Sequence, residues 1–130
     1  MSKRQRRFSL AARLASVWHA VRGLGILLRE QHNARIHLVA ALIAVGLALL
    51  LGLSAGEWLV LILVIGWVLA LESFNSALEY LCDAISEQPH PLIGKAKDVA
   101  AAAVLISALT AALIGLLIFL PKIWLLLQTL

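Results

Sequence analysis

Charged residues are scarce in this sequence, and hydrophobic residues fill most of it. Of the 130 residues, 14% are charged and 62% are hydrophobic, whereas soluble domains are usually about 45–50% apolar. This composition argues against a soluble globular protein and predicts an integral membrane protein with a single domain over residues 1–130. The one cysteine, Cys82, allows no internal disulfide, so the cysteine content does not indicate a redox compartment.

The sequence motifs of the familiar soluble kinases and nucleotide-binding folds are also absent. No GxxxxGK[ST] run occurs, and neither do the HRD and DFG motifs of protein kinases. The pair Gly94 and Lys95 has no glycine five residues earlier, and Gly23 and Gly25 do not follow a predicted strand. Any nucleotide chemistry in this chain therefore needs a different arrangement of residues.

Basic residues are concentrated near the N-terminus. Eight of the eleven Lys and Arg residues lie at or before position 35: Lys3, Arg4, Arg6, Arg7, Arg13, Arg22, Arg29 and Arg35. A basic N-terminus ahead of apolar spans is typical of the cytoplasmic side of a membrane, near anionic headgroups. A nucleic-acid-binding arm is the other interpretation, but no soluble domain follows the run, so we expect no nucleic-acid partner.

The apolar pattern predicts four helices. Apolar residues recur every three or four positions at about 9–29, which indicates an amphipathic helix on the cytoplasmic membrane surface. Three further segments, at about 36–53, 58–82 and 98–120, are predicted to be transmembrane helices, which makes the fold all-α. We expect residues 54–57 to form an outer turn, residues 84–95 to form an inner loop, and Pro121 to end the third span.

The second predicted span carries polar residues on one face. On a helix with 100° per residue, all of them lie within about 60° of one direction: Glu72, Asn75, Ser76, Glu79 and Asp83. Acids inside a membrane are costly and are interpreted as functional. The apolar part of this helix is too short to cross alone, so the acids are expected at the inner membrane surface. Three helices shield such a stripe poorly, which favours an oligomer.

Carboxylates, an amide and a lysine are groups that suit phosphoryl transfer. Carboxylate and amide oxygens suit Mg²⁺ that is shared with phosphates, and Lys97 can neutralise phosphate oxygens. Two other functions stay open: a proton- or ion-conducting oligomer with acids along a polar path, and a structural membrane protein whose acids hold helices together. Asp83 can also simply stop its helix, and Lys97 with Asp98 can form an interfacial anchor and a first-turn acid.

Histidines are the remaining candidate ligands. His19, His32 and His37 are predicted to lie at the membrane interface, and their spacing does not indicate a zinc site.

The spacing of the polar residues resembles that of the prokaryotic diacylglycerol kinase family, which includes undecaprenol kinases. The pattern E-x-x-N-[ST]-A-[IL]-E-x-x-x-D, then a histidine and A-K-D, matches Glu72, Asn75, Ser76, Ala77, Leu78, Glu79, Asp83, His90, Ala96, Lys97 and Asp98. The segments NARIH (33–37) and VAAAAVL (99–105) are also similar, so the resemblance covers roughly residues 16–120.

The resemblance implies a fold and an activity. It implies a homotrimer in the bacterial inner (cytoplasmic) membrane, each protomer having a surface helix and three spans, with active sites shared between protomers. It also implies transfer of the ATP γ-phosphate to a lipid alcohol, diacylglycerol or undecaprenol, on the cytoplasmic side with Mg²⁺ as cofactor.

Individual roles are implied by the same resemblance. Glu72 is the implied general base toward the lipid hydroxyl, and Glu79 is implied to bind both Mg²⁺ and the nucleotide. The nucleotide and its phosphates are implied to lie by Asn75, Gln88, His90, Lys97 and Asp98, with Asp83 nearby.

One position departs from the family pattern. The family usually has a glutamate, as a second metal ligand, two residues before the asparagine of N-x-R-I-H; here that position is Gln31 and the acid is Glu30. A shift of one residue turns a helical side chain by about 100°. Either Glu30 reaches the metal, or Gln31 offers its amide oxygen, or the metal is held with less protein charge; Glu30 is the predicted ligand.

Overall fold

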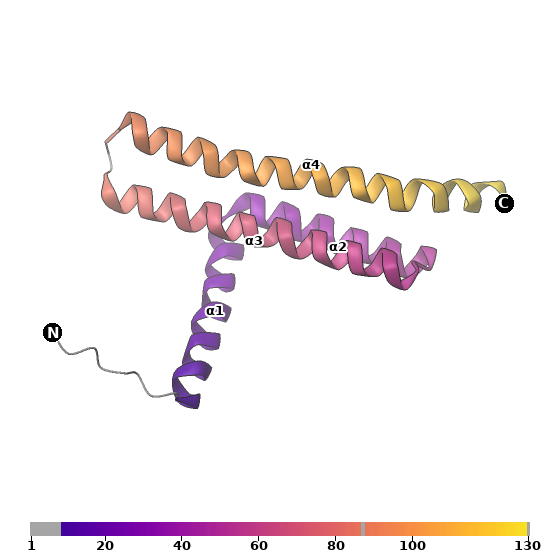
Figure 1. The fold of residues 1–130 in the computed structure, drawn as a ribbon, viewed down its shortest axis with the longest axis horizontal. Helices are drawn as coiled ribbons and strands as arrows, with labels where there is room; N and C mark the ends of the chain where they lie inside the picture. The colour runs from indigo at the N-terminus through magenta and orange to yellow at the C-terminus, as the bar shows by residue number, and fades with distance from the viewer. Residues whose placement is uncertain (1–8, 87, 130) are drawn as a thin grey trace.

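The described part of the protein, residues 9–86 and 88–129 of a computed structural model, consists of helices. It contains four α-helices and no strand: α1 (Leu10–Glu30), α2 (His32–Leu51), α3 (Ala55–Ile85) and α4 (Pro91–Gln128) (Figure 1). The predicted all-α fold, with an N-terminal helix and three long apolar helices, is confirmed. The first four basic residues lie outside the described residues: Lys3, Arg4, Arg6 and Arg7.

Helices α2, α3 and α4 run alongside one another, and α1 leaves this bundle at a steep angle (Figure 1). The chain runs along α2, returns along α3 and runs forward again along α4. The corner between α1 and α2, the end of α3 and the start of α4 therefore lie toward the same end of the bundle. Gln31 alone separates α1 from α2, so the corner is tight.

Each helix of the bundle is long and apolar enough to cross a membrane. The three helices contain 20, 31 and 38 residues, and about 20 helical residues span a hydrocarbon core of about 30 Å. Helices α3 and α4 are thus longer than the hydrocarbon core requires. Large apolar side chains such as Leu50, Trp67 and Phe74 are exposed on the single chain, a surface that suits lipid or another protein chain.

The end of the bundle far from α1 is held by an apolar cluster and by polar contacts of Glu57. Ala48, Leu61 and Phe119, one from each long helix, form the buried cluster. The Glu57 carboxylate accepts the Ser54 backbone N–H at 2.7 Å, while Ser54 Oγ accepts the Glu57 backbone N–H at 3.4 Å. This reciprocal capping box begins α3 at Ala55, so Glu57 lies in its first turn and not in the predicted outer turn.

Helix α4 is longer at both ends than the sequence predicts. It begins at Pro91, inside the predicted loop 84–95, because proline at the first helical position forfeits no intrahelical hydrogen bond. It also continues through Pro121 to Gln128, so the prediction that Pro121 ends this helix is wrong. Transmembrane helices tolerate proline where neighbouring groups satisfy the freed backbone carbonyl. Lys122, one residue further, pairs with Glu57 at 3.1 Å and fixes this part of α4 against α3.

Candidate active site

The second half of α3 buries three polar side chains. Glu72 is 1% exposed, Ser76 2% and Asn75 8%. The Ser76 hydroxyl donates to the backbone carbonyl of Glu72 at 2.9 Å, so its hydrogen-bonding need is met within the helix. Glu72 and Asn75 each keep a buried side-chain oxygen without a hydrogen bond, and these two residues define the site.

Two buried oxygen atoms in this part of α3 have no partner among the described residues. They are Glu72 Oε2 and Asn75 Oδ1. The amide nitrogen of Asn75 is used, since Nδ2 donates to Glu79 Oε1 at 3.1 Å. Buried polar atoms in folded proteins are normally hydrogen-bonded, so the two unpaired oxygens mark a place for a ligand, a water or an ion.

A cavity of about 340 Å³ connects these groups. Its wall from α3 is polar, and its wall from α4 is apolar. The lining residues are Asn33, Ile36, His37, Glu72, Asn75, Glu79, Ala101, Val104, Leu105 and Ala108. The structure therefore brings three predicted site residues, Glu72, Asn75 and Glu79, onto one cavity with apolar groups opposite them.

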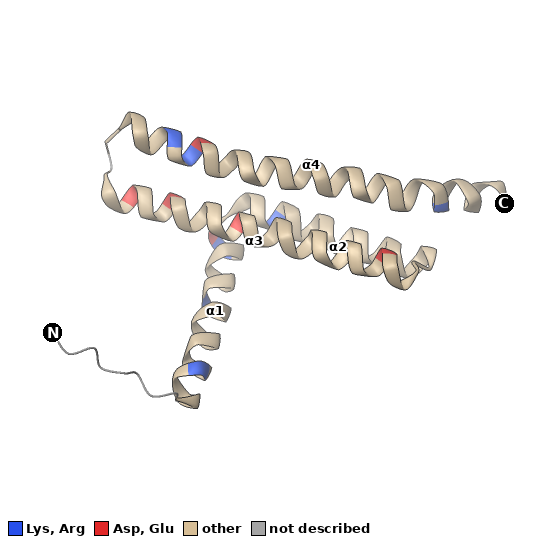
Figure 2. Ribbon diagram, in the orientation of Figure 1, with Lys and Arg blue, Asp and Glu red and all other residues tan. Residues whose placement is uncertain are grey.

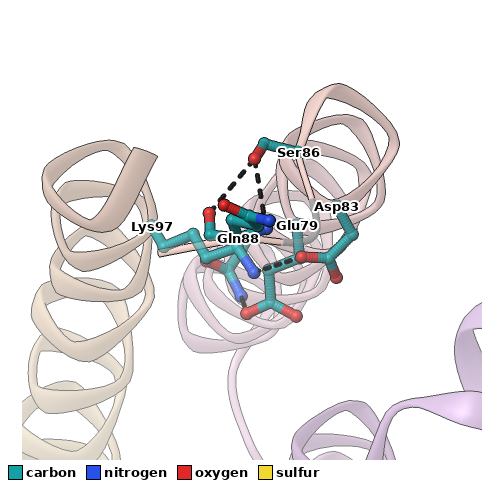
Figure 3. A network of polar contacts seen from close by, with 6 residues as sticks. Glu79, Asp83, Ser86, Gln88 and Lys97 are labelled. Atoms are coloured by element: carbon teal, nitrogen blue, oxygen red, sulfur yellow. Dashed lines mark hydrogen bonds and ion pairs between the residues drawn. The ribbon is translucent and has the colours of Figure 1, made fainter. Parts of the chain in front are cut away.

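A second polar cluster lies where α3 ends and α4 begins. Figure 2 shows basic residues near the start of α4 facing acidic residues near the end of α3. Lys97 reaches from α4 to α3, where its Nζ pairs with Asp83 Oδ1 at 2.5 Å beside Glu79 (Figure 3). Lys97 is thus held beside the acidic residues Glu79 and Asp83 of α3.

This cluster borders a cavity of about 520 Å³. The lining residues are Asp83, Ser86, Gln88, Pro89, His90, Pro91, Ile93, Gly94 and Lys97. The structure thus brings four predicted residues together: Asp83, Gln88, His90 and Lys97. His90 also caps α4, because its Nδ1 accepts the Leu92 backbone N–H at 3.2 Å. Ser86 Oγ accepts the Gln88 backbone N–H and donates to the Gln88 carbonyl, both at 3.1 Å (Figure 3).

Two predicted ligands are placed apart from these cavities. Asp98 is exposed and lines neither of them. The Glu30 carboxylate accepts a hydrogen bond from the Tyr80 hydroxyl at 2.9 Å, and Gln31 Nε2 donates to the same hydroxyl oxygen at 3.4 Å. Both candidates for the second metal ligand therefore contact α3 through one tyrosine.

The donor set decides what kind of cation would fit. Across residues 9–86 and 88–129, no three His, Cys, Asp or Glu side chains are grouped so as to hold a metal ion. Glu79 and the unpaired Asn75 Oδ1 are nevertheless hard oxygen donors beside one cavity. Mg²⁺ commonly takes one or two carboxylates and completes its shell with water and substrate phosphates. The donors fit a divalent cation that is shared with phosphates, not one enclosed by this chain alone.

Some residues of the site are not among the sequence predictions. Asn33 and His37 line the cavity with Glu72; the sequence predicts His37 only at the membrane interface. Both belong to the NARIH segment, so the signal was present in the spacing of that segment. Tyr80 has no such signal, because a tyrosine that follows Glu79 looks like an ordinary interfacial aromatic residue.

The fold and the site define a class: a helical membrane protein with a carboxylate, amide and lysine cluster at one end of its bundle. A family model described as prokaryotic diacylglycerol kinase matches residues 18–119. The chain belongs to this family and is a kinase.

Individual relatives are similar over different lengths. The chain is 39% identical over 123 residues to the undecaprenol kinase of Bacillus subtilis, and this match covers 95% of this chain and 100% of the relative. It is 36% identical over 111 residues to the diacylglycerol kinase of a Synechocystis species, covering 85% of this chain and 63% of the relative. It is 41% identical over 73 residues to the diacylglycerol kinase of Escherichia coli, and this match covers 56% of this chain and 60% of the relative.

Proposed function

We propose that this kinase transfers the γ-phosphate of ATP to the hydroxyl of a lipid alcohol, diacylglycerol or undecaprenol. The names of its relatives support both acceptors. The long apolar helices support access to a lipid. The concentration of basic residues at or before position 35 supports a cytoplasmic N-terminus and a cytoplasmic active site in the bacterial inner membrane.

The buried carboxylate of Glu72 is the observation that carries the proposal. Its Oε2 atom is buried and has no hydrogen-bond partner among the described residues. It lies on a cavity with apolar residues of α4 opposite it. A general base must be within hydrogen-bond reach of the proton that it removes, and Oε2 offers an open acceptor position for a lipid hydroxyl.

The proposed reaction uses Glu72 as the proton acceptor. The hydroxyl proton of the lipid moves to the Glu72 carboxylate as the hydroxyl oxygen forms a bond to the γ-phosphorus of ATP. The bond between that phosphorus and the oxygen bridging to the β-phosphate breaks, and ADP leaves with the bridging oxygen. The products are the phosphorylated lipid, ADP and a proton on Glu72, which later passes to water.

The polar residues at the ends of α3 and α4 are proposed to hold the nucleotide. Lys97 exchanges the Asp83 carboxylate for phosphate oxygens, and Gln88 and His90 lie beside the nucleotide. The cavity that these residues share supports the assignment. Asn75 contributes from the neighbouring cavity. Asp98 is assigned to the nucleotide from the family pattern, since it lines neither cavity.

Glu79 and Glu30 are the proposed ligands of Mg²⁺. When bound, Mg²⁺ neutralises charge on the phosphate oxygens. The hydrogen bond from Asn75 to Glu79 orients the Glu79 carboxylate and leaves its second oxygen available. Hydrogen-bonded carboxylates of this kind are typical of metal sites.

A homotrimer is proposed as the functional unit. Many large apolar side chains of the single chain are exposed. An apolar groove of about 400 Å³ between α2, α3 and α4 contains several alanines and Gly115. Small residues allow close approach of helices in membranes, which supports assembly of several copies.

An acceptor panel tests the proposed function. The purified full-length chain in mixed micelles is given labelled ATP, Mg²⁺ and, separately, diacylglycerol, undecaprenol or ceramide. We expect phosphorylation of at least one acceptor, with diacylglycerol or undecaprenol preferred. Absence of transfer to all three would overturn the proposal. Proton or ion flux in liposomes without ATP would favour a conducting oligomer in its place.

A further inference from the structure

Tyr80 joins the corner between α1 and α2 to α3. Its hydroxyl donates to Glu30 Oε2 at 2.9 Å and accepts from Gln31 Nε2 at 3.4 Å. Glu30 is the last residue of α1, and Gln31 is the single residue before α2. One side chain of α3 thus contacts both residues that turn the chain from the surface helix into the bundle.

The direction of these hydrogen bonds distinguishes Glu30 from Gln31. The amide of Gln31 donates to Tyr80, and Tyr80 donates to Glu30, so the carboxylate is the final acceptor. Hydrogen bonds in such a series polarise and strengthen one another. An ionised carboxylate has about four acceptor positions on two oxygens. Glu30 can therefore keep its bond from Tyr80 through Oε2 and bind a cation through Oε1.

The position of Tyr80 in the sequence relates this corner to the proposed metal site. Tyr80 directly follows Glu79, a proposed ligand of Mg²⁺, and Glu79 lies beside the cavity of Glu72. A contact at Tyr80 therefore holds the corner at the level of Glu79 along α3, on the neighbouring face of the helix, since successive helical side chains point about 100° apart. Ligating carboxylates are commonly fixed by a second hydrogen-bonding partner of this kind.

We propose that Tyr80 is a positioning residue that fixes the Glu30 carboxylate as the second acid, with Glu79, for the divalent cation of the nucleotide. The inference rests on the proposed function. It accounts for the displaced acid in this chain: where the family pattern has a glutamate at position 31, this chain has the acid at position 30 and a tyrosine that holds it.

The test removes only the hydroxyl. Tyr80→Phe keeps the ring and loses both hydrogen bonds, and Ser73→Ala is the matched control. Ser73 is also on α3, and its hydroxyl bonds only to the backbone carbonyl of Leu69, at 2.8 Å, among the described residues. Binding of Mn²⁺ by the full-length protein with a non-hydrolysable ATP analogue is measured by electron paramagnetic resonance. The Mg²⁺ concentration for half-maximal lipid phosphorylation is measured in parallel.

We expect Tyr80→Phe to weaken Mn²⁺ binding about tenfold, the lower end of the range for residues that orient a metal ligand. The Mg²⁺ requirement should rise by a similar factor, while Ser73→Ala changes neither quantity. Glu30→Gln should weaken binding at least as much. Because Tyr80 acts through Glu30, the double variant should bind Mn²⁺ no more weakly than Glu30→Gln alone.

Two results would overturn the inference. One is a folded Tyr80→Phe protein with unchanged Mn²⁺ affinity; the other is a double variant whose loss equals the product of the two single losses. Mn²⁺ binding does not require turnover, so this readout is separate from the proposed function. An inactive wild-type protein that binds Mn²⁺ with the expected variant effects would refute the lipid kinase assignment and retain the role of Tyr80.

Discussion

Burial of a carboxylate without a partner costs free energy, because the protein does not replace the lost hydrogen bonds to water. Glu72 is 1% exposed and its Oε2 is unpaired among the described residues. Asn75 Oδ1, about one helical turn later, is also buried and has no partner among the described residues. Polar groups kept in this state on one cavity are expected where a substrate supplies the missing partners.

Lys97 gives a prediction at the scale of single residues. Lys97→Met should raise the KM for ATP about 10- to 100-fold, because a hydrogen bond to a charged group contributes about 1.5–3 kcal/mol. Lys97→Arg keeps the charge and should have a smaller effect. The measurement is the initial rate of lipid phosphorylation against ATP concentration. An unchanged KM for Lys97→Met would show that Lys97 does not bind the phosphates.

The sequence predicts the residues of the site better than their partners. The helical spacing of Glu72, Asn75 and Glu79 places them on one face, and the structure puts them on one cavity. The pairing of Lys97 with Asp83 and the contact of Tyr80 with Glu30 join different helices. Periodicity within one helix carries no information on such pairs, so they were not predictable.

At the scale of helices, the start of α3 depends on the capping box of Ser54 and Glu57. Ser54→Ala should lower the free energy of unfolding by about 1 kcal/mol, the usual cost of losing an N-cap. Thr110→Ala is a suitable control, because its hydroxyl bonds only to the carbonyl one turn earlier, at 2.9 Å, among the described residues. Its effect should stay within about 0.5 kcal/mol.

Unfolding in detergent, followed by circular dichroism, measures both variants. Activity per folded molecule should stay unchanged for Ser54→Ala, because Ser54 precedes α3 and Glu72 lies about 25 Å along that helix, at 1.5 Å per residue. A stability equal to that of the wild type would show that the capping box does not stabilise α3.

The sequence predicts the presence of each helix better than it predicts the residues at which the helix begins and ends. Long apolar runs identify the three long helices from hydropathy alone. The predicted ends at the outer turn, the inner loop and Pro121 were displaced. Caps such as Ser54 decide one end through a single hydrogen bond, and a first-position proline such as Pro91 decides another through its fixed φ and its missing N–H. An average over a window of residues does not resolve either effect.

At the scale of the whole molecule, the proposed homotrimer predicts self-association in the membrane. The exposed apolar surface of the single chain is compatible with it, since such a surface suits either lipid or another protein chain. Cross-linking of the protein in native membranes should give a ladder that ends at three copies. The proposed trimer would bury apolar groups in addition to those covered by lipid, including the groove of about 400 Å³. A ladder that stops at one or two copies would contradict the trimer and leave the kinase assignment standing.

Glu72 is the proposed base of this lipid kinase, and replacing it with glutamine tests that role with the smallest change in side-chain shape. Glu72→Gln keeps the shape of the side chain and removes its basicity; Glu57→Gln makes the same change in the first turn of the same helix, as a control. Transfer of labelled phosphate from ATP to the preferred lipid is measured at saturating substrates. We predict a kcat about 10²- to 10⁴-fold lower for Glu72→Gln, with the fold and nucleotide binding retained, and near wild-type turnover for Glu57→Gln. A folded Glu72→Gln protein with wild-type turnover would show that Glu72 is not the base.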